Sequence, residues 1–162
     1  MYTMEINHME KDNMGSVYAD ITLKNAWDVE SLEHGFITKE DVHETTVRAL
    51  VDTGAWTLVI PEDLCGKLGL RIRCKNESTV ANGETVMSSM SEGIEVHWKD
   101  RSLICDAVVL PGADEVLLGA IPLEGLDLIV DPRREKLIGR HGDTALHTLK
   151  QAIRLPHIRK IS

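Results

Sequence analysis

Short runs of apolar and β-branched residues, separated by turn residues, extend over most of this chain and constrain its fold more than any other feature. Val17, Ala19, Ile21 and Leu23 alternate with polar residues, which is the period of a half-buried β-strand. The polar residues 25–44 are expected to form a long loop. The other segments with strand character are residues 45–51, 57–60, 78–81, 84–87, 94–98, 102–105, 107–110, 116–118, 128–130 and 136–138. We therefore predict a mainly β domain.

Turn and helix signals lie between these strands. Asn82-Gly83 separates two strand formers and predicts a hairpin with a type I′ turn, and Lys99-Asp100 predicts a second hairpin. Pro61 fits the first position of a helix that Gly69 would end. A further short helix is expected around residues 122–125. The mainly β fold should thus contain one or two short helices.

The composition excludes several classes of protein. The length of 162 residues suits one domain. No apolar run reaches the roughly 18–20 residues of a membrane span, and the first residues lack the pattern of a secretory signal. The histidines have no zinc-ligand spacing, no glycine-rich phosphate loop is present, and the aromatic residues are few and scattered. We expect no metal, no cofactor, no nucleic-acid partner and no membrane association.

The three cysteines, Cys65, Cys74 and Cys105, are widely spaced and form no CxxC pair. This usage favours a reducing compartment, so a cytoplasmic location is expected. Cysteines without a partner act mostly as small buried hydrophobic residues, and we expect that role for these three.

Charge is distributed unevenly along the chain. Residues 133–162 hold eight Lys and Arg against two acids, a net charge of +6, whereas the other residues hold 10 basic and 24 acidic groups, a net charge of −14. Beyond Gly139, Asp143 or Thr144 can cap a helix whose apolar side would be Leu146, Leu149 and Ile153. The basic tail, residues 140–162, is either a tether or intramolecular contact, or a solvated surface helix.

The chemically informative segment is Asp52-Thr53-Gly54. A shuffled chain of this composition would contain about 0.06 such tripeptides, so the motif alone is only suggestive. Its context adds weight, because a buried strand leads into Asp52 and Leu117-Leu118-Gly119 follows later in the chain. An alternative remains open, in which Asp52 is an Asx-turn residue whose side chain accepts backbone N–H bonds.

These features resemble the retropepsin-like aspartic proteases, and most closely the single-domain bacterial type. The resemblance covers residues 14–139, which would make residues 1–13 an N-terminal extension. The matching segments are Ala49-Leu50-Val51-Asp52-Thr53-Gly54-Ala55, Leu58-Val59-Ile60-Pro61, Ala81-Asn82-Gly83-Glu84, Leu117-Leu118-Gly119 and Leu126-Asp127-Leu128-Ile129-Val130-Asp131-Pro132. The resemblance implies a closed β-barrel or cradle, followed here by a C-terminal helical tail.

The resemblance also implies an aspartic endopeptidase. Such an enzyme holds a water between two carboxylates, one ionised and one protonated. The sequence supplies one Asp-Thr-Gly, so a homodimer would bring two copies of Asp52 together on a two-fold axis. Thr53 would hydrogen-bond across that axis, and Gly54 would permit the tight turn.

The same resemblance assigns residues to a peptide or protein substrate. Ala55 would lie in the substrate floor, and Asn82 and Gly83 would form the tip of a flap that closes over the peptide. Leu117 and Leu118 would pack beneath the catalytic loop, with Gly119 at a point that leaves no room for a side chain.

Trp56 and Thr57 occupy the place where viral relatives usually carry an acidic residue, and Trp56 is expected to pack rather than to contact substrate. The alternative function is a non-catalytic module of the same fold that dimerises or binds peptides.

Overall fold

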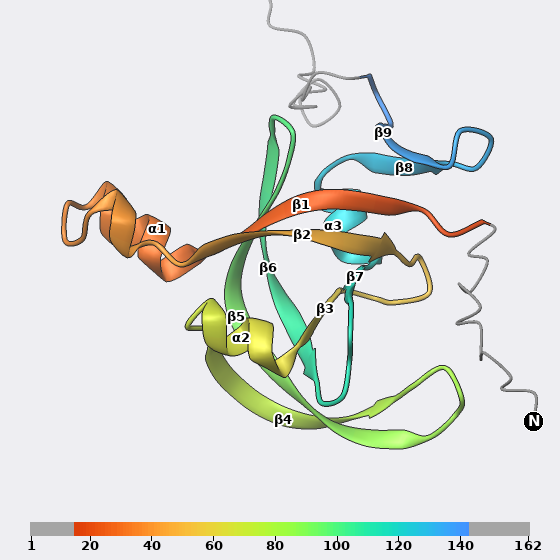
Figure 1. Cartoon of the computed structure of the whole chain (residues 1–162), viewed down its shortest axis with the longest axis horizontal. Helices are drawn as coiled ribbons and strands as arrows, with labels where there is room; N and C mark the ends of the chain where they lie inside the picture. Colours follow the sequence, from red (N-terminus) through yellow and green to blue (C-terminus); the bar gives the residue numbers. More distant parts are fainter. Residues whose placement is uncertain (1–14, 143–162) are drawn as a thin grey trace, which may run out of the picture.

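The structure, a computed structural model, describes residues 15–142, and the expected strands form within that range (Figure 1). The elements in chain order are β1 (Tyr18–Asn25), α1 (Ala26–Glu33), the 3₁₀ turn η1 (Lys39–Asp41), β2 (Glu44–Val51), β3 (Leu58–Pro61), α2 (Glu62–Lys67), β4 (Arg71–Thr79), β5 (Thr85–Trp98), β6 (Arg101–Leu110), β7 (Val116–Leu118), α3 (Ala120–Gly125), β8 (Leu128–Asp131) and β9 (Lys136–Gly139). The mainly β fold class is confirmed.

Six strands close into a barrel of mixed direction. The sheet runs in the order β1-β2-β7-β3-β6-β5, and a second pairing between β1 and β5 joins its two ends. The β2–β7 and β3–β6 pairs are parallel, whereas β1 pairs antiparallel with both of its neighbours. Closure removes the free edge that β1 would otherwise present to other chains. The β8–β9 hairpin forms a separate two-stranded sheet.

The barrel interior follows from the alternation seen in the sequence. Ile21 and Leu23 on β1 are at most 1% exposed, while Thr22 and Lys24, which alternate with them, point outward and are partly exposed. Burial of one such aliphatic side chain contributes about 1.5–3 kcal/mol. The other apolar side chains that are at most 2% exposed are Ala49, Leu58, Ile60, Leu68, Ile94, Val96, Ala107, Leu118, Pro122, Leu126 and Leu128.

The β4–β5 hairpin forms an arm that projects from the barrel, because β4 pairs with β5 alone (Figure 1). The hairpin at Asn82-Gly83 is confirmed, but the expected type I′ turn is wrong. Beyond the Thr79–Thr85 pair, the N–H of Val80 donates to the carbonyl of Glu84 at 2.9 Å, so residues 81–83 form the turn, and Gly83 alone among them has a positive φ, of 84°. The Asn82 side chain accepts the N–H of Glu84 at 2.9 Å and stabilises this longer turn.

The expected long loop at residues 25–44 is also wrong, since α1 and η1 form there. Asn25 caps α1, and its Oδ1 accepts the N–H of Trp27 at 2.9 Å. No residue of α1 is buried, so the helix lacks the apolar stripe by which a helix is usually recognised. Within residues 15–142, no helix is long and apolar enough to cross a membrane.

A buried arginine attaches the β8–β9 hairpin to the barrel. Arg101, which is 4% exposed, donates from Nη1 to the carbonyl oxygens of Leu126 and Asp127 at 2.9 and 3.0 Å. Asp127 also contacts Nδ1 of His141 through Oδ1 at 2.8 Å. Desolvation alone would raise the pKa of Asp127, but the hydrogen bonds from His141 and Arg101 outweigh it and lower that pKa.

Asn25 provides a test of how α1 is held. The side chain is 5% exposed, and its Nδ2 donates to the carbonyl oxygens of Leu68 and Gly69 at 2.9 and 3.1 Å. Asn25→Ala should lower the free energy of unfolding by about 2–3 kcal/mol, because it removes the cap and leaves buried carbonyls unpaired. Urea denaturation measures this loss. Asn76→Ala on the exposed β4 strand is the control and should change stability by less than about 0.5 kcal/mol. An equal loss in the two variants would contradict this role of Asn25.

Candidate active site

The backbone positions Asp52 at the end of β2. Val51 pairs with Leu118 in the parallel β2–β7 ladder, and the N–H of Asp52 donates to the carbonyl of Leu118 at 3.1 Å. The chain then leaves the sheet through residues 52–57, which we call the Asp52 loop, before β3 begins at Leu58. Asp52 is partly exposed, and Thr53 and Gly54 are exposed. The loop is therefore open to a substrate or a second chain.

The Asp52 side chain is held by its own loop. Gly54 donates its N–H to Oδ1 of Asp52 at 2.9 Å, and Ala55 donates to the main-chain carbonyl of Asp52 at 3.2 Å. This is the Asx-turn that the sequence left open as an alternative. Among the described residues, Oδ2 accepts no hydrogen bond. One carboxylate oxygen is thus fixed by the backbone while the other remains available for a ligand.

The segment after β7 supports the Asp52 loop from beneath. Ala120 and Ile121 are in the first turn of α3, where main-chain N–H groups have no partner within the helix. They donate instead to the carbonyls of Ala55 and Trp56, at 2.8 and 3.0 Å. Four main-chain groups are satisfied by this contact, which fixes the height of the loop above the barrel.

Gly119 lies at the closest point of this contact. A Cβ atom there would overlap the carbonyl oxygen of Thr57 and come within 2.6 Å of that of Ala55. Leu118 is fully buried beneath the loop, and Leu117 pairs with Val59 of β3. Leu118 and Gly119 therefore pack beneath the Asp52 loop as expected, with no room for a side chain at Gly119. Leu117 lies beside them, paired with β3.

Thr57 and Trp56 differ in their surroundings. Thr57 is 2% exposed and donates from Oγ1 to the carbonyl of Asp106 at 3.0 Å. Trp56 is 58% exposed, so the expectation that it acts as a packing residue is wrong. Its side chain lines a hollow of about 400 Å³ beside the loop, together with Thr57, Arg73, Met90, Ile104, Cys105, Asp106 and Ile121.

The hollow combines apolar walls with one ion pair, because Nη2 of Arg73 on β4 lies 2.9 Å from Oδ2 of Asp106 on β6. Burial, followed by the nearby Asp106 charge, raises the pKa of the Cys105 thiol to about 12, which keeps the thiol protonated near neutral pH. Cys65 is buried as expected, whereas Cys74 is exposed. Sequence reasoning missed Arg73, Met90 and Ile121 because the fold alone brings them next to the Asp52 loop.

Asn82 and Gly83 are at the exposed tip of the β4–β5 hairpin, and they project from the same side of the barrel as the Asp52 loop in Figure 1. In the described part of one chain, no hydrogen bond joins the hairpin tip to the loop. The structure thus groups the expected site residues of the Asp52 loop, which are Asp52, Thr53, Gly54 and Ala55. The expected flap residues, Asn82 and Gly83, make no hydrogen bond with this loop. Residues 15–142 contain no group of three or more His, Cys, Asp or Glu side chains that could hold a metal ion.

A closed mixed barrel whose Asp-Thr-Gly loop rests on a Leu-Leu-Gly segment defines the class of retropepsin-like folds. The model of one such family, described as "gag-polyprotein putative aspartyl protease", matches residues 39–124, just over half of the chain. The chain belongs to this family of retropepsin-like aspartyl proteases. A search of curated proteins found no significant match.

The family match extends from η1 to α3 and so includes both the Asp52 loop and the hairpin tip. The expected domain limits at residues 14 and 139 stay predictions. The expected extension at residues 1–13 lies outside the described residues, as does the tail after residue 142 with its expected helix.

Gly119 offers a test of the contact beneath the loop. Gly119→Ala should destabilise the protein by about 3 kcal/mol or more, because the new methyl group meets backbone that cannot rotate away. Gly66→Ala on α2 is a matched control, since a Cβ there meets nothing within 4 Å. That variant should be neutral or slightly more stable. Urea unfolding of both variants measures the difference, and equal stability would contradict the close packing.

Proposed function

We propose that the protein is an aspartic endopeptidase whose active form is a homodimer. The observation that carries the proposal is the Asp52 loop, which is exposed at its surface yet fixed from beneath by Gly119 and α3. Membership of the aspartyl protease family supports peptide-bond hydrolysis as the reaction. The sequence holds one Asp-Thr-Gly, and hydrolysis of this type needs two carboxylates, so a second copy of the chain supplies the other.

In the proposed dimer, the two Asp52 carboxylates share one proton, because adjacent carboxylates cannot both ionise at low cost. The ionised carboxylate removes a proton from a water that attacks the peptide carbonyl. The protonated carboxylate donates a hydrogen bond to the developing oxyanion and later a proton to the leaving amine. The hydrogen bond from Gly54 keeps the Asp52 side chain oriented for this exchange. Thr53 would bond across the two-fold axis.

The substrate is proposed to be a peptide bound in extended form. Its main chain would hydrogen-bond to the floor near Ala55 and to the hairpin tip at Asn82 and Gly83. Closure of the hairpin over the peptide would exclude water from the reaction. The hollow beside Trp56 is apolar enough to receive a side chain of the peptide.

A second function has one specific observation in its favour. The Asx-turn at Asp52 is complete within one chain, so the aspartate is also explained by a structural role. In that case the protein would be a non-catalytic module that dimerises or binds peptides. The two functions differ in what happens when the charge of Asp52 is removed and the turn is kept.

Asp52→Asn separates these functions, because an Asn side-chain oxygen still accepts the N–H of Gly54. We expect the variant to unfold at the same urea concentration as the native protein and to lose at least about 100-fold in kcat on a peptide library, the lower range of general acid–base effects. Asp63→Asn on the exposed face of α2 is the matched control and should retain activity. Full activity in Asp52→Asn would exclude the catalytic role, whereas its loss together with stability would leave only the structural role.

Mixing tests the dimer. Equal amounts of native chain and Asp52→Asn, once their subunits have exchanged, should give about half the activity of the native chain at the same native concentration, because half of the native chains then sit in mixed dimers. The rate per chain should also fall on dilution. If the mixture instead keeps the full activity of its native chains, and the rate per chain does not change on dilution, a single chain is sufficient for catalysis.

A further inference from the structure

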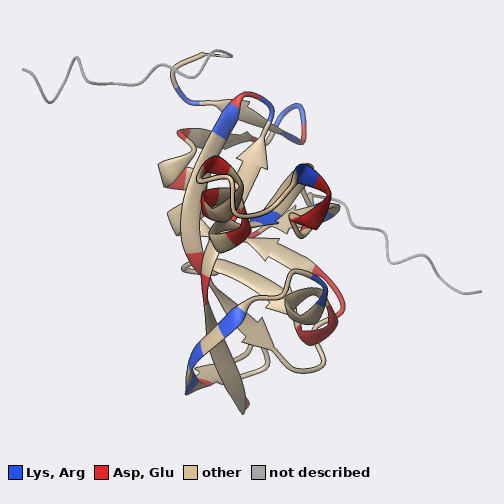
Figure 2. Cartoon of the chain, turned by 90° about the vertical axis from the view of Figure 1, so that its left-hand side faces the viewer, with Lys and Arg blue, Asp and Glu red and all other residues tan. Residues whose placement is uncertain are grey.

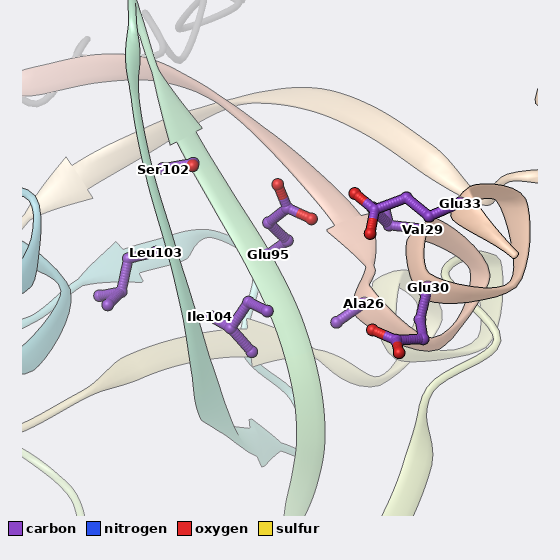
Figure 3. Close-up of a pocket in the computed structure, with 8 residues that line it drawn as sticks. All are labelled: Ala26, Val29, Glu30, Glu33, Glu95, Ser102, Leu103 and Ile104. Carbon is purple, nitrogen blue, oxygen red and sulfur yellow. The ribbon is translucent and has the colours of Figure 1, made fainter.

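A second hollow lies between α1 and the β5–β6 hairpin (Figure 3), and Ile104 separates it from the hollow beside Trp56. The volume of this second hollow is about 280 Å³. Figure 3 shows the Glu33 side chain extending from α1 toward Glu95 on β5, whereas Leu103 points away, to where it packs against Gly125 of α3. The lining residues are Ala26, Val29, Glu30, Glu33, Glu95, Ser102, Leu103 and Ile104. We call this site the α1 hollow.

The α1 hollow is acidic and apolar at once. It is lined by three carboxylates and by no Lys or Arg. Glu30 lies 3.2 Å from the His34 imidazole and Glu95 lies 2.6 Å from that of His97, while Glu33 has no ion pair with any described residue. Figure 2 looks onto the α1 end of the molecule, where Asp and Glu mark the helical ribbon. On the wall opposite α1, Ile104 is 62% exposed, a high value for a large aliphatic side chain.

The described chain ends beside the β5–β6 hairpin, which forms one wall of this hollow. Nη2 of Arg101 donates to the carbonyl of Gly142, and the N–H of Arg140 donates to the carbonyl of Asp127 at 2.8 Å. Arg101 precedes Ser102 on β6, and Ser102 is part of the wall of the α1 hollow. Side chains alternate along a strand, so Arg101 points to the face of β6 opposite Ser102 and Ile104, and the described chain ends at Gly142 on that opposite face.

The composition of residues 143–162 complements the hollow. The segment has four Lys and Arg against one acid, and it carries Leu146, Leu149 and Ile153 among other apolar residues. Twenty residues span about 30 Å even in the compact form of a helix, so its length does not limit its reach. Basic and apolar side chains are the two kinds that this acidic and apolar hollow can receive.

We infer that the α1 hollow is the docking site for the C-terminal segment 143–162 of the same chain. Its basic side chains pair with Glu30, Glu33 and Glu95, and its apolar side chains cover Ile104. The Asp52 loop is at the other end of β2 from α1, so the docked segment leaves Asp52 itself open (Figure 1). Because Ile104 also lines the hollow beside Trp56, the segment covers part of the wall of that hollow. This inference does not depend on the proposed proteolytic function.

Limited trypsin digestion of the full-length chain tests the docking, because trypsin cuts after Lys150, Arg154, Arg159 and Lys160. The test variant is Glu30→Gln/Glu33→Gln/Glu95→Gln, which removes the three charges and creates no trypsin site. At low salt, cleavage within residues 143–162 should be about fivefold slower in the native chain than in this variant, a modest factor because exposed ion pairs are individually weak. In about 0.5 M salt the two rates should converge.

The control variant Glu62→Gln/Glu77→Gln/Glu84→Gln changes the net charge equally at exposed residues outside the hollow. It should be cut as slowly as the native chain. Equal cleavage of the native chain and the test variant at low salt would overturn the inference. Protection that grows with protein concentration would also overturn it, since the segment of a second copy would then occupy the hollow.

Discussion

The contact between Gly119 and the Asp52 loop is the constraint on which the candidate site depends. Because Gly119 lacks a side chain, the backbone after β7 can approach the carbonyls of Ala55 and Thr57. The first N–H groups of α3 then find their partners in the loop rather than in water. The orientation of Asp52 is therefore set by main-chain hydrogen bonds and parallel strand pairing, which vary far less than side-chain contacts do.

Much of the barrel could be predicted from sequence because its signals are local. The alternation along β1, the β-branched run of β2 and the Gly69 stop after α2 each depend on neighbouring residues alone. The Asp52 loop could be identified from three residues and the strand before them. The need for glycine at position 119 came from family resemblance, and its physical reason, the overlap with Thr57, is visible only in three dimensions.

What the sequence could not predict depends on contacts between distant residues. The helix α1 has no apolar stripe, and its cap Asn25 is oriented by carbonyls more than 40 residues away, at Leu68 and Gly69. Arg101 follows a hairpin turn and looks like a solvated charge, yet it is buried against the carbonyls of Leu126 and Asp127. The turn at Asn82 is different, because its longer form is stabilised by a local bond in which the Asn82 side chain accepts the N–H of Glu84. The placement of α1 and of Arg101 therefore depends on contacts that no local pattern records.

The Asx-turn at Asp52 does not decide between a structural and a catalytic aspartate, since both roles need the side chain held in one orientation. Exposure is the more informative property. A turn that only shapes the backbone gains nothing from leaving Thr53, Gly54 and Trp56 open to solvent, and an exposed tryptophan beside a hollow costs solubility. A loop that must meet a second chain and a substrate requires such exposure. The combination of a rigid base with an open surface therefore fits the proposed site, which a partner copy would complete.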